Sequence, residues 1–210
     1  MRDQYPPPIG RWPREAAGMV LFYQVLFPIL WLIWGVYWWA QSRSTKATAR
    51  QESPFSRLAY IAPLLVAFAL LWLPSLPIPV LRERFVPLAA WPFWAAAGAT
   101  LTAAGLSLAI WARGHLGRNW SATITIKKDH ELTINGPYRA VRHPIYTGLL
   151  LAFVGQATAR GELQEALAVA LALWSFWRKL RIEERWMRAQ FGVEYQLYER
   201  QVPALIPFIL

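Results

Sequence analysis

Residues 17–40 form a run of 24 amino acids without a single charged side chain. As an α-helix rising 1.5 Å per residue, this run would be about 36 Å long, which is enough to cross a bilayer core of ~30 Å. Because lipid offers no partners for backbone N–H and C=O groups, such a run must satisfy them within itself, as a helix does. The run therefore predicts a membrane helix and restricts the whole chain to folds that a bilayer permits.

Four further apolar stretches follow the first. They cover about residues 58–76, about residues 86–111, residues 144–159 and residues 166–177. The last two are too short to span a bilayer alone and are interpreted as a helical hairpin, tilted or partly embedded, that packs against the longer helices. We therefore expect an all-α integral membrane protein with about five transmembrane helices, the last two a helical hairpin, and a C-terminal helix in the cytosol. Small residues in the stretch at about residues 86–111, such as Ala95 and Gly98, would permit close helix packing, and the alternating segment "SATITI" suggests a short strand or extended piece.

Composition supports a membrane protein over a nucleic-acid-binding one. The chain carries 13 Trp and a net charge of +10, and Trp is enriched where an apolar ring meets the wet edge of a bilayer. The absence of Cys excludes disulfides, thiolate metal sites and a Cys nucleophile. With only three His, we expect no metal site, no nucleic-acid partner and an anionic membrane surface as the target of the positive charge.

The charges also predict a topology for a single membrane domain, residues 1–210, whose three N-terminal membrane helices occupy residues 1–112. With five crossings, the loops 41–57 and 112–143 and the tail from Arg178 lie on one side, and they hold 16 of the 22 Lys and Arg residues. The positive-inside rule assigns this side to the cytoplasm and the N-terminus to the outside.

Several widespread ligand-binding motifs are missing. The sequence has no GxGxxG loop, no GxxxxGK[ST] loop, no HExxH pair and no GxSxG elbow. If the protein is an enzyme, its site is not one of the common soluble designs.

The stretch "GPYRAVRHPIYTGLLL" places cationic side chains at the mouth of an apolar helix. Gly136-Pro137 marks a turn, and Pro144 suits the first turn of a helix, so that His143 lies near its N-cap. A helix N-terminus attracts an anionic group such as a carboxylate, and Tyr138 and Tyr146 supply aromatic faces. The alternative is that the basic residues, including Arg139 and Arg142, only hold lipid phosphates.

The tail combines an apolar stripe with charged residues. The stripe has helical spacing and comprises Leu180, Met187, Phe191, Tyr195, Tyr198 and Val202, with Gly192 as a possible break. Glu184 shares this stripe, and a carboxylate there is costly unless it meets a cationic ligand or an Arg. The alternatives are a solvated Glu pair balanced by nearby Arg residues, and an interfacial amphipathic helix for the segment around Glu194 and Arg200.

Two stretches carry a family resemblance. "LGRNWSATITIKKDHELTINGPYRAVRHPIYTG" and "EERWMRAQFGVEYQLYERQVPALIPFI" resemble the isoprenylcysteine carboxyl methyltransferase family and the wider group of small integral-membrane methyltransferases that includes phospholipid N-methyltransferases. The resemblance covers about residues 113–209, and it implies that residues 113–210 form a catalytic half that binds S-adenosylmethionine in a pocket facing the cytosol.

The resemblance also implies roles for individual residues. The cofactor-binding residues that it implies are His130, Glu131, Leu132, Thr133, Tyr138, His143, Pro144, Ile145, Tyr146, Glu183 and Glu184. On the substrate side it implies a basic residue near the start of the tail helix (Arg178, Lys179 or Arg181) and the group of Glu194 and Arg200. The chain departs from the eukaryotic enzymes at Gln201, where they have Arg, and at Ala204-Leu205, where they have Thr-Gly. These departures concern the acceptor more than the methyl donor.

The resemblance thus predicts a membrane methyltransferase that uses S-adenosylmethionine to O-methylate the carboxylate of a lipophilic, isoprenylcysteine-like acceptor, which enters from the bilayer among the membrane lipids. Arg200 is the predicted catalytic clamp on that carboxylate, and Glu194 is predicted to position Arg200 or the substrate. A phospholipid amine or a small thiol is the alternative acceptor, with His143 or a Glu as base. Alternatives of another class are a non-catalytic membrane protein and a nicotinamide-dependent membrane reductase. The sequence leaves the oligomeric state open.

Overall fold

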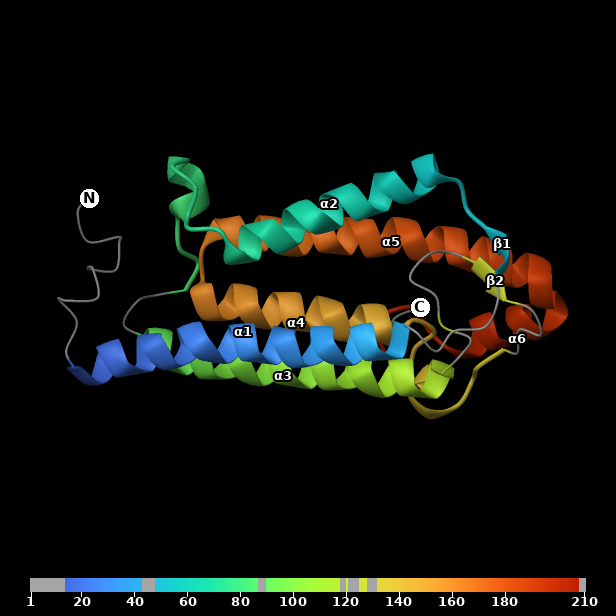
Figure 1. The fold of residues 1–210 in the computed structure, drawn as a ribbon, viewed down its shortest axis with the longest axis horizontal. Helices are drawn as coiled ribbons and strands as arrows, with labels where there is room; N and C mark the ends of the chain where they lie inside the picture. The colour runs from blue at the N-terminus through green and yellow to red at the C-terminus, as the bar shows by residue number, and fades with distance from the viewer. Residues whose placement is uncertain are drawn as a thin grey trace.

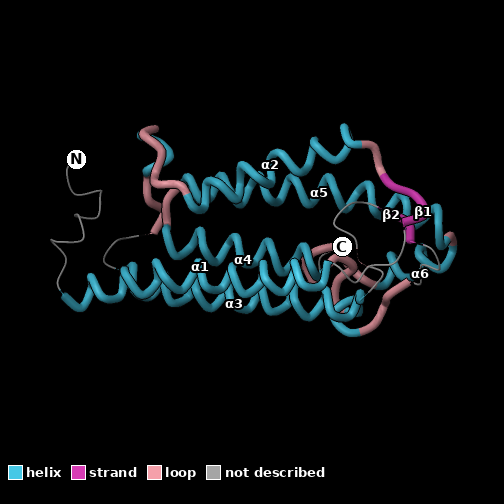
Figure 2. Tube along the Cα trace, in the orientation of Figure 1, coloured by secondary structure: helices cyan, strands magenta, loops and turns pink. Residues whose placement is uncertain are grey.

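The computed structural model describes residues 14–42, 48–86, 90–117, 120, 125–127 and 132–207, and the helices in them run along one long axis (Figures 1 and 2). The α-helices are α1 (Arg14–Ser42), α2 (Pro54–Trp72), α3 (Trp91–Leu116), α4 (Pro144–Arg160), α5 (Leu163–Phe191) and α6 (Val193–Gln201). Two short 3₁₀ helices are η2 (Pro79–Arg82) and η5 (Gly136–Arg139). The prediction of a helical membrane protein is confirmed, whereas the five crossings and the hairpin of the last two helices stay predictions.

The structure adds a small β-ribbon to the predicted helices. β1 (Thr48–Gln51) and β2 (Thr125–Lys127) pair antiparallel, with Arg50 opposite Ile126. The alternation in "SATITI" had suggested a short extended piece, and β2 includes the end of that motif. The ribbon ties the loop after α1 to the loop after α3, so these two sequence-distant loops meet at one end of the bundle (Figure 2).

The long helices form two layers. α3 packs against both α1 and α4, and α2 packs against α5. Figure 1 shows α1, α3 and α4 on one side of the molecule and α2 with α5 on the other. α4 and α5 also contact each other across the layers.

Glycines allow α3 and α4 to approach closely, as the small residues of this stretch had predicted. A Cβ on Gly98 or Gly105 would collide with the backbone of α4, and one on Gly148 or Gly155 would collide with the backbone of α3. Because lipid provides no hydrophobic force between helices, such close contact is a main source of helix association in membranes. The packing fixes α4, and with it the residues at the start of α4.

Within the described residues, three helices are long and apolar enough to cross a membrane: Leu21–Ser42, Pro54–Trp72 and Trp91–Leu116. Apolar side chains on their outer surfaces, such as Leu32, Phe55 and Phe93, are exposed, as expected of residues that face lipid. The protein is therefore an integral membrane protein. α4 has only 17 residues, and crossing of the bilayer by α4 and α5 remains a prediction.

α5 differs from the predicted outline. The sequence suggested an apolar stretch over residues 166–177 and a separate charged tail, whereas α5 is one continuous helix of 29 residues. It ends at Gly192, whose positive φ of 54° stops the helix at the predicted break. The apolar half and the charged half of α5 thus form one continuous helix.

Side chains of α4 and α5 satisfy the C-terminal carbonyls of α2. The Gln156 side chain donates to the carbonyl of Leu71 (3.1 Å), and the Gln164 side chain donates to the carbonyl of Leu70 (3.0 Å). The Gln156 carbonyl also accepts from the Trp31 indole at 2.7 Å. Helix ends leave unpaired carbonyls, and these contacts join α1, α2, α4 and α5 near the α4–α5 turn.

The opposite end of the bundle gathers η5, α6, the β-ribbon and the start of α4 (Figure 1). Arg113, buried near the end of α3, anchors this end by donating to the carbonyls of Gly117 (2.6 Å) and Gln41 (2.7 Å). Its guanidinium lies 4.5 Å from the centroid of the Trp120 ring. The described parts of the segments that the charge count had assigned to one side of the membrane therefore lie towards one end of the molecule.

Candidate active site

The start of α4 has the local structure that its sequence predicted. α4 begins at Pro144, and His143 is its N-cap residue. Upstream, Gly136 has a φ of 56°, and the ring of His115 occupies the place where a Cβ at this position would lie. A residue with a side chain would be strained there, which explains why the turn before η5 uses Gly. His115 itself lies in the last turn of α3 rather than in a loop.

Residues 203–205 lie across the start of α4 and accept hydrogen bonds from it. The backbone N–H of Arg142 donates to the carbonyl of Pro203 (2.8 Å), and that of His143 donates to Ala204 (3.0 Å). The Thr147 hydroxyl donates to the carbonyl of Leu205 at 2.6 Å. Backbone amides just before α4, which the sequence had suggested would face a ligand, are therefore engaged by the tail.

Arg142 connects the segment before α4 to the acidic half of α5. Its Nε and Nη2 donate to Glu184 Oε1 at 2.9 and 2.7 Å. Its Nη1 donates to the carbonyls of Glu199 (3.0 Å) and Val202. A single guanidinium thus joins α4, α5 and α6, and all of its nitrogens are used within the protein.

Glu184 is the buried carboxylate at the centre of this network. It is 4% exposed, and besides Arg142 it contacts His143 Nε2 at 3.2 Å and Arg188 Nη2 at 3.5 Å. Burial alone would raise the pKa of Glu184, but the hydrogen bonds and positive charges of His143 and Arg142 outweigh burial and hold the pKa at about 2. The carboxylate is therefore ionised at neutral pH.

Glu183 and Tyr146 form a second contact between α4 and α5. The Tyr146 hydroxyl donates to both carboxylate oxygens of Glu183 at 2.8 Å, and His143 Nδ1 lies 3.7 Å from Glu183 Oε2. The Tyr146 ring is stacked between the rings of His143 (centroids 5.5 Å apart) and Phe176 (5.1 Å). Both faces of Tyr146 are therefore covered by protein, and its role is to fix the start of α4 on α5.

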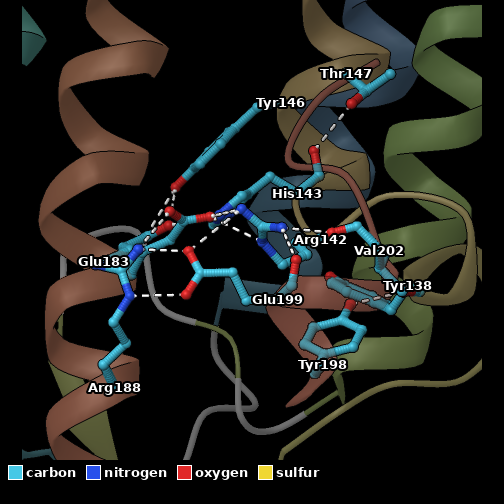
Figure 3. Close-up of polar contacts among 11 residues, drawn as sticks. Tyr138, Arg142, His143, Tyr146, Thr147, Glu183, Arg188, Tyr198, Glu199 and Val202 are labelled. Atoms are coloured by element: carbon cyan, nitrogen blue, oxygen red, sulfur yellow. Dashed lines mark hydrogen bonds and ion pairs between the residues drawn. The ribbon is translucent and has the colours of Figure 1, made fainter. Parts of the chain in front are cut away.

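A further set of contacts attaches α6. Arg188 binds Glu199, with Nε 2.8 Å from Oε2, and this partnership lowers the pKa of Glu199. The Tyr198 hydroxyl donates to the carbonyl of Tyr138 at 2.6 Å, and the Tyr138 hydroxyl donates to Ala112 at 3.3 Å. Figure 3 shows these side chains converging on the space between α4, α5 and the tail.

The structure brings most of the predicted cofactor-binding residues together. Tyr138, His143, Pro144, Ile145, Tyr146, Glu183 and Glu184 lie in or next to this network, and Leu132 packs on the cluster of Tyr195, Tyr198 and Val202. Thr133, which follows Leu132 in the sequence, is half-buried. His130 and Glu131 lie outside the described residues. Glu194 and Arg200, the predicted catalytic pair, have exposed side chains on α6, and among the contacts of the described residues none joins either one to Glu183 or Glu184. Their roles stay predictions.

Sequence reasoning had given no site role to three residues in the network: Arg142, Arg188 and Glu199. The spacing of Glu184 and Arg188, four residues apart on a helix, is a recognisable ion-pair pattern. The contact of Arg188 with Glu199 depends on the turn at Gly192, and the contacts of Arg142 depend on the packing of α4 on α5 and on the path of the tail. Sequence spacing encodes neither of these.

Comparison with known proteins finds relatives for the part of the chain that contains most of these residues. Residues 93–194 match the phospholipid methyltransferase family. The chain is 32% identical over 96 residues to protein-S-isoprenylcysteine O-methyltransferase B of Arabidopsis thaliana, covering 44% of this chain and 49% of that protein. It is 34% identical over 96 residues to the Schizosaccharomyces pombe protein-S-isoprenylcysteine O-methyltransferase, covering 44% and 41%.

A shorter match has higher identity. Methanethiol S-methyltransferase 2 of Bradyrhizobium diazoefficiens is 46% identical over 72 residues, covering 33% of this chain and 26% of that protein. The matches with the isoprenylcysteine enzymes span about half the length of those relatives. Residues 93–194, which run from α3 into α6 and contain the network described above except for its α6 and tail residues, therefore match the phospholipid methyltransferase family and are similar to the isoprenylcysteine O-methyltransferases.

Proposed function

We propose that this protein is a membrane methyltransferase that uses S-adenosylmethionine as its methyl donor. The observation that carries the proposal is the network in which Arg142 and His143, at the start of α4, bind Glu184 of α5, while Tyr146 binds Glu183. The family relationship is to methyltransferases, and this network lies within the matched residues except at its tail.

The chemistry of these residues fits the donor, which combines a sulfonium cation with a zwitterionic amino-acid tail. Glu183 is the better candidate for the cation, because its side chain is 19% exposed whereas Glu184 is already saturated by Arg142 and His143. No side chain caps the first turn of α4, so the amides of Ile145 and Tyr146 suit a carboxylate. Leu132, which is half-buried and packs on the cluster of Tyr195, Tyr198 and Val202, is the candidate apolar contact for a nucleoside.

When bound, the donor supplies an electrophilic methyl group, and the protein's own task is to align the acceptor and exclude water. The residues described here serve that task by holding the walls of the site in a fixed arrangement. The Arg142 bonds, the stack of His143, Tyr146 and Phe176, and the strap of residues 202–205 hold three segments in one arrangement.

The acceptor that the relatives suggest first is a lipophilic molecule with a carboxylate, as in an isoprenylcysteine. A carboxylate is ionised at pH 7 and needs no general base. A small thiol is the second candidate, favoured by the 46% identity to a methanethiol S-methyltransferase. In this proposal the acceptor enters from the bilayer and the donor enters from the cytosol. The N-terminus lies outside, and the segments 41–57, 112–143 and 178–210, whose sequence holds 16 of the 22 Lys and Arg residues, lie in the cytoplasm.

Donor binding tests the proposal directly. We expect purified protein in lipid nanodiscs to bind S-adenosylhomocysteine saturably in a calorimetric titration, and Glu183→Gln to weaken binding at least tenfold while the protein stays folded. Arg185→Gln, an exposed position two residues further along α5, is the control and should leave binding unchanged. A flat titration of the wild-type protein would refute a methyltransferase site.

Turnover identifies the chemical class of the product. Incubation with radiolabelled donor and a total lipid extract should place label in a base-labile fraction, because methyl esters are hydrolysed by base whereas N-methyl groups are not. Base-stable label in a phospholipid would select the amine alternative, and volatile label released only after addition of a thiol would select the thiol.

A further inference from the structure

Glu165 is a buried carboxylate that the proposed function does not use. It lies in the first turn of α5, at the end of the bundle remote from the proposed donor site (Figure 1). Its side chain is 0% exposed, and its neighbour Gln164 ties α5 to the carbonyl of Leu70 in α2. Glu165 therefore lies where α5 meets α2 and the end of α4, outside the three helices that are long and apolar enough to span a membrane.

Within the described part of the chain, neither oxygen of this carboxylate accepts a hydrogen bond. Arg160 Nε lies 2.9 Å from Glu165 Oε1, but its N–H is not directed at that oxygen, so the contact is an ion pair without a hydrogen bond. The backbone N–H of Glu165 donates to the carbonyl of Glu162 at 3.2 Å. A carboxylate that has left water and has no hydrogen-bond donor is costly to keep charged.

Arg160 compensates this charge only in part. The Arg160 side chain is 32% exposed, and its Nη1 is shared with the carbonyls of Leu71 (3.3 Å) and Leu73 (3.5 Å) at the end of α2. Water screens the field of a cation that remains in contact with solvent. The counter-charge of Glu165 is therefore weaker than that of a fully enclosed ion pair.

The other described groups whose charges act on Glu165 are Glu162 and Arg84. Arg84 Nη1 donates to Glu162 Oε1 at 3.3 Å, and Arg84 Nη2 donates to the carbonyl of Arg160 at 2.7 Å. Glu162 also accepts from the Ser75 hydroxyl at 2.5 Å. Arg84 is thus engaged by Glu162, and the negative charge of Glu162 makes a second carboxylate nearby less favourable.

These surroundings place the titration of Glu165 near neutral pH. Burial raises its pKa to about 7, Arg160 opposes this change, Glu162 adds to it, and Arg84 opposes it. Glu184 at the other end of α5 is also buried, but its hydrogen bonds to Arg142 and His143 keep it ionised. The two carboxylates differ because Glu165 has no hydrogen-bond donors of this kind.

We propose that Glu165 is a proton-binding site, and that its proton sets how firmly the first turn of α5 is held against α2 and α4. A neutral Glu165 needs no counter-charge, so this joint is strongest when the proton is bound. The positive-inside rule predicts that this end of the bundle faces away from the cytoplasm, so the proton comes from the outer side. The proposal does not depend on the methyltransferase function.

The sign of the pH effect follows from the two states of the chain. The carboxyl group has a pKa of 4.5 when unfolded and about 7 when folded, so between these values the folded protein holds a proton that the unfolded chain releases. The stability that depends on Glu165 therefore increases as the pH falls from about 7 to about 4.5. This direction is opposite to that expected for Glu184.

The test compares melting temperatures of the wild-type protein and Glu165→Gln in lipid nanodiscs, without any methyl donor, from about pH 8.5 to about pH 5. Gln has nearly the shape of Glu and is neutral throughout. We expect the variant to gain most over the wild type at the alkaline end, and this gain to shrink as the pH falls through about 7. Glu83→Gln removes an exposed carboxylate at the same end of the bundle and should differ from the wild type by a constant amount.

A difference between wild type and Glu165→Gln that stays constant across this pH range overturns the proposal. Arg160→Met supplies a second measurement that remains available if Glu165→Gln does not fold. Because Arg160 lowers the pKa of Glu165, its removal should move the rise in melting temperature to higher pH, and a rise at the wild-type pH also overturns the proposal. Infrared difference spectra of the wild-type protein should show the C=O stretch of a protonated carboxyl group growing over the same pH range, and its absence there contradicts proton binding by Glu165.

Discussion

At the scale of single residues, the ion pair of Arg142 and Glu184 has the largest energetic consequence. Both side chains are almost fully removed from solvent, at 9% and 5% exposure, and the remaining partners of Arg142 are carbonyls of α6 and the tail. Replacing a buried pair with apolar groups can be nearly neutral, but removing one partner leaves an uncompensated charge. The pair therefore makes the three segments that it joins interdependent.

Removal of one partner should consequently be severe. We expect Arg142→Met to destabilise the protein by about 3–5 kcal/mol, measured by thermal unfolding in nanodiscs, and the double substitution Arg142→Met with Glu184→Met to recover part of the loss. Arg185→Met, which changes an exposed cation on α5 next to Glu184, should change stability by less than about 0.5 kcal/mol. A double variant as unstable as the sum of its single variants would contradict a direct energetic coupling between Arg142 and Glu184.

The pH dependence of this pair follows from the pKa of Glu184. Its pKa falls from 4.5 to about 2 on folding, so the unfolded chain takes up the proton first as the pH decreases. The stability contributed by Glu184 is therefore complete above about pH 4.5 and is lost as the pH falls towards 2. We expect the difference in melting temperature between wild type and Glu184→Gln to be constant from pH 7 to pH 5 and to shrink below that. A difference that already declines at pH 6 would contradict the assignment.

How far the sequence predicts the site can be judged from Glu184 and Tyr146. The position of Glu184 on an apolar stripe correctly indicated that it needs a partner, and one of the two partners considered, an Arg, is present. The identity of that Arg could not be predicted, because Arg142 and Glu184 are brought together only by the packing of α4 on α5. Tyr146 was expected to offer an aromatic face, whereas His143 and Phe176 cover its faces. Spacing identifies which residues share a helix face, but it does not reveal what that face meets.

At the scale of elements, the contact between α3 and α4 determines where the site lies. Glycines on both helices leave the two backbones in direct contact, so α4 has little freedom to slide or rotate against α3. The sequence predicted this kind of packing from the small residues of α3, and it predicted the start of α4 from Pro144. It did not predict that α5 continues through the charged region, because the apolar pattern ends near Trp177 while ion pairs four residues apart, such as Glu184 with Arg188, sustain the helix.

Adding a methyl group at this contact should separate the helices. A Cβ at position 148 would collide with the Gly105 carbonyl and the Ala109 amide, so we expect Gly148→Ala to lower stability by roughly 1–3 kcal/mol. Gly35→Ala in α1 is the matched control, since nothing lies within 4 Å of a Cβ there, and it should be neutral or slightly stabilising. Equal effects of the two substitutions on melting temperature would show that α3 and α4 are not in such close contact.

At the scale of the whole molecule, the two ends of the bundle differ in charge and in structure. η5, α6 and the start of α4 are at one end, and the α4–α5 turn with η2 is at the other (Figure 1). Because the basic segments gather at the first end, the positive-inside rule predicts that this end faces the cytoplasm.

The chain contains no Cys, so single cysteines can report this orientation without background. Val80→Cys in η2 and Ala189→Cys near the end of α5 are exposed positions at opposite ends. We expect a membrane-impermeant maleimide to label Val80→Cys in intact cells and to label Ala189→Cys only after the membrane is opened. The reverse pattern would invert the topology, and labelling of both positions in intact cells would contradict it.

The bonds from Gln156 and Gln164 to the carbonyls that end α2 have a mechanical consequence. The Gln156 bond ties α4 to α2 across the two helix layers, and the Gln164 bond ties α5 to α2, at the end remote from the proposed donor site. At the other end the layers are tied again, by Arg142 with Glu184 and by Tyr146 with Glu183. Because polar bonds close the bundle at both ends, one layer cannot swing away from the other without breaking them.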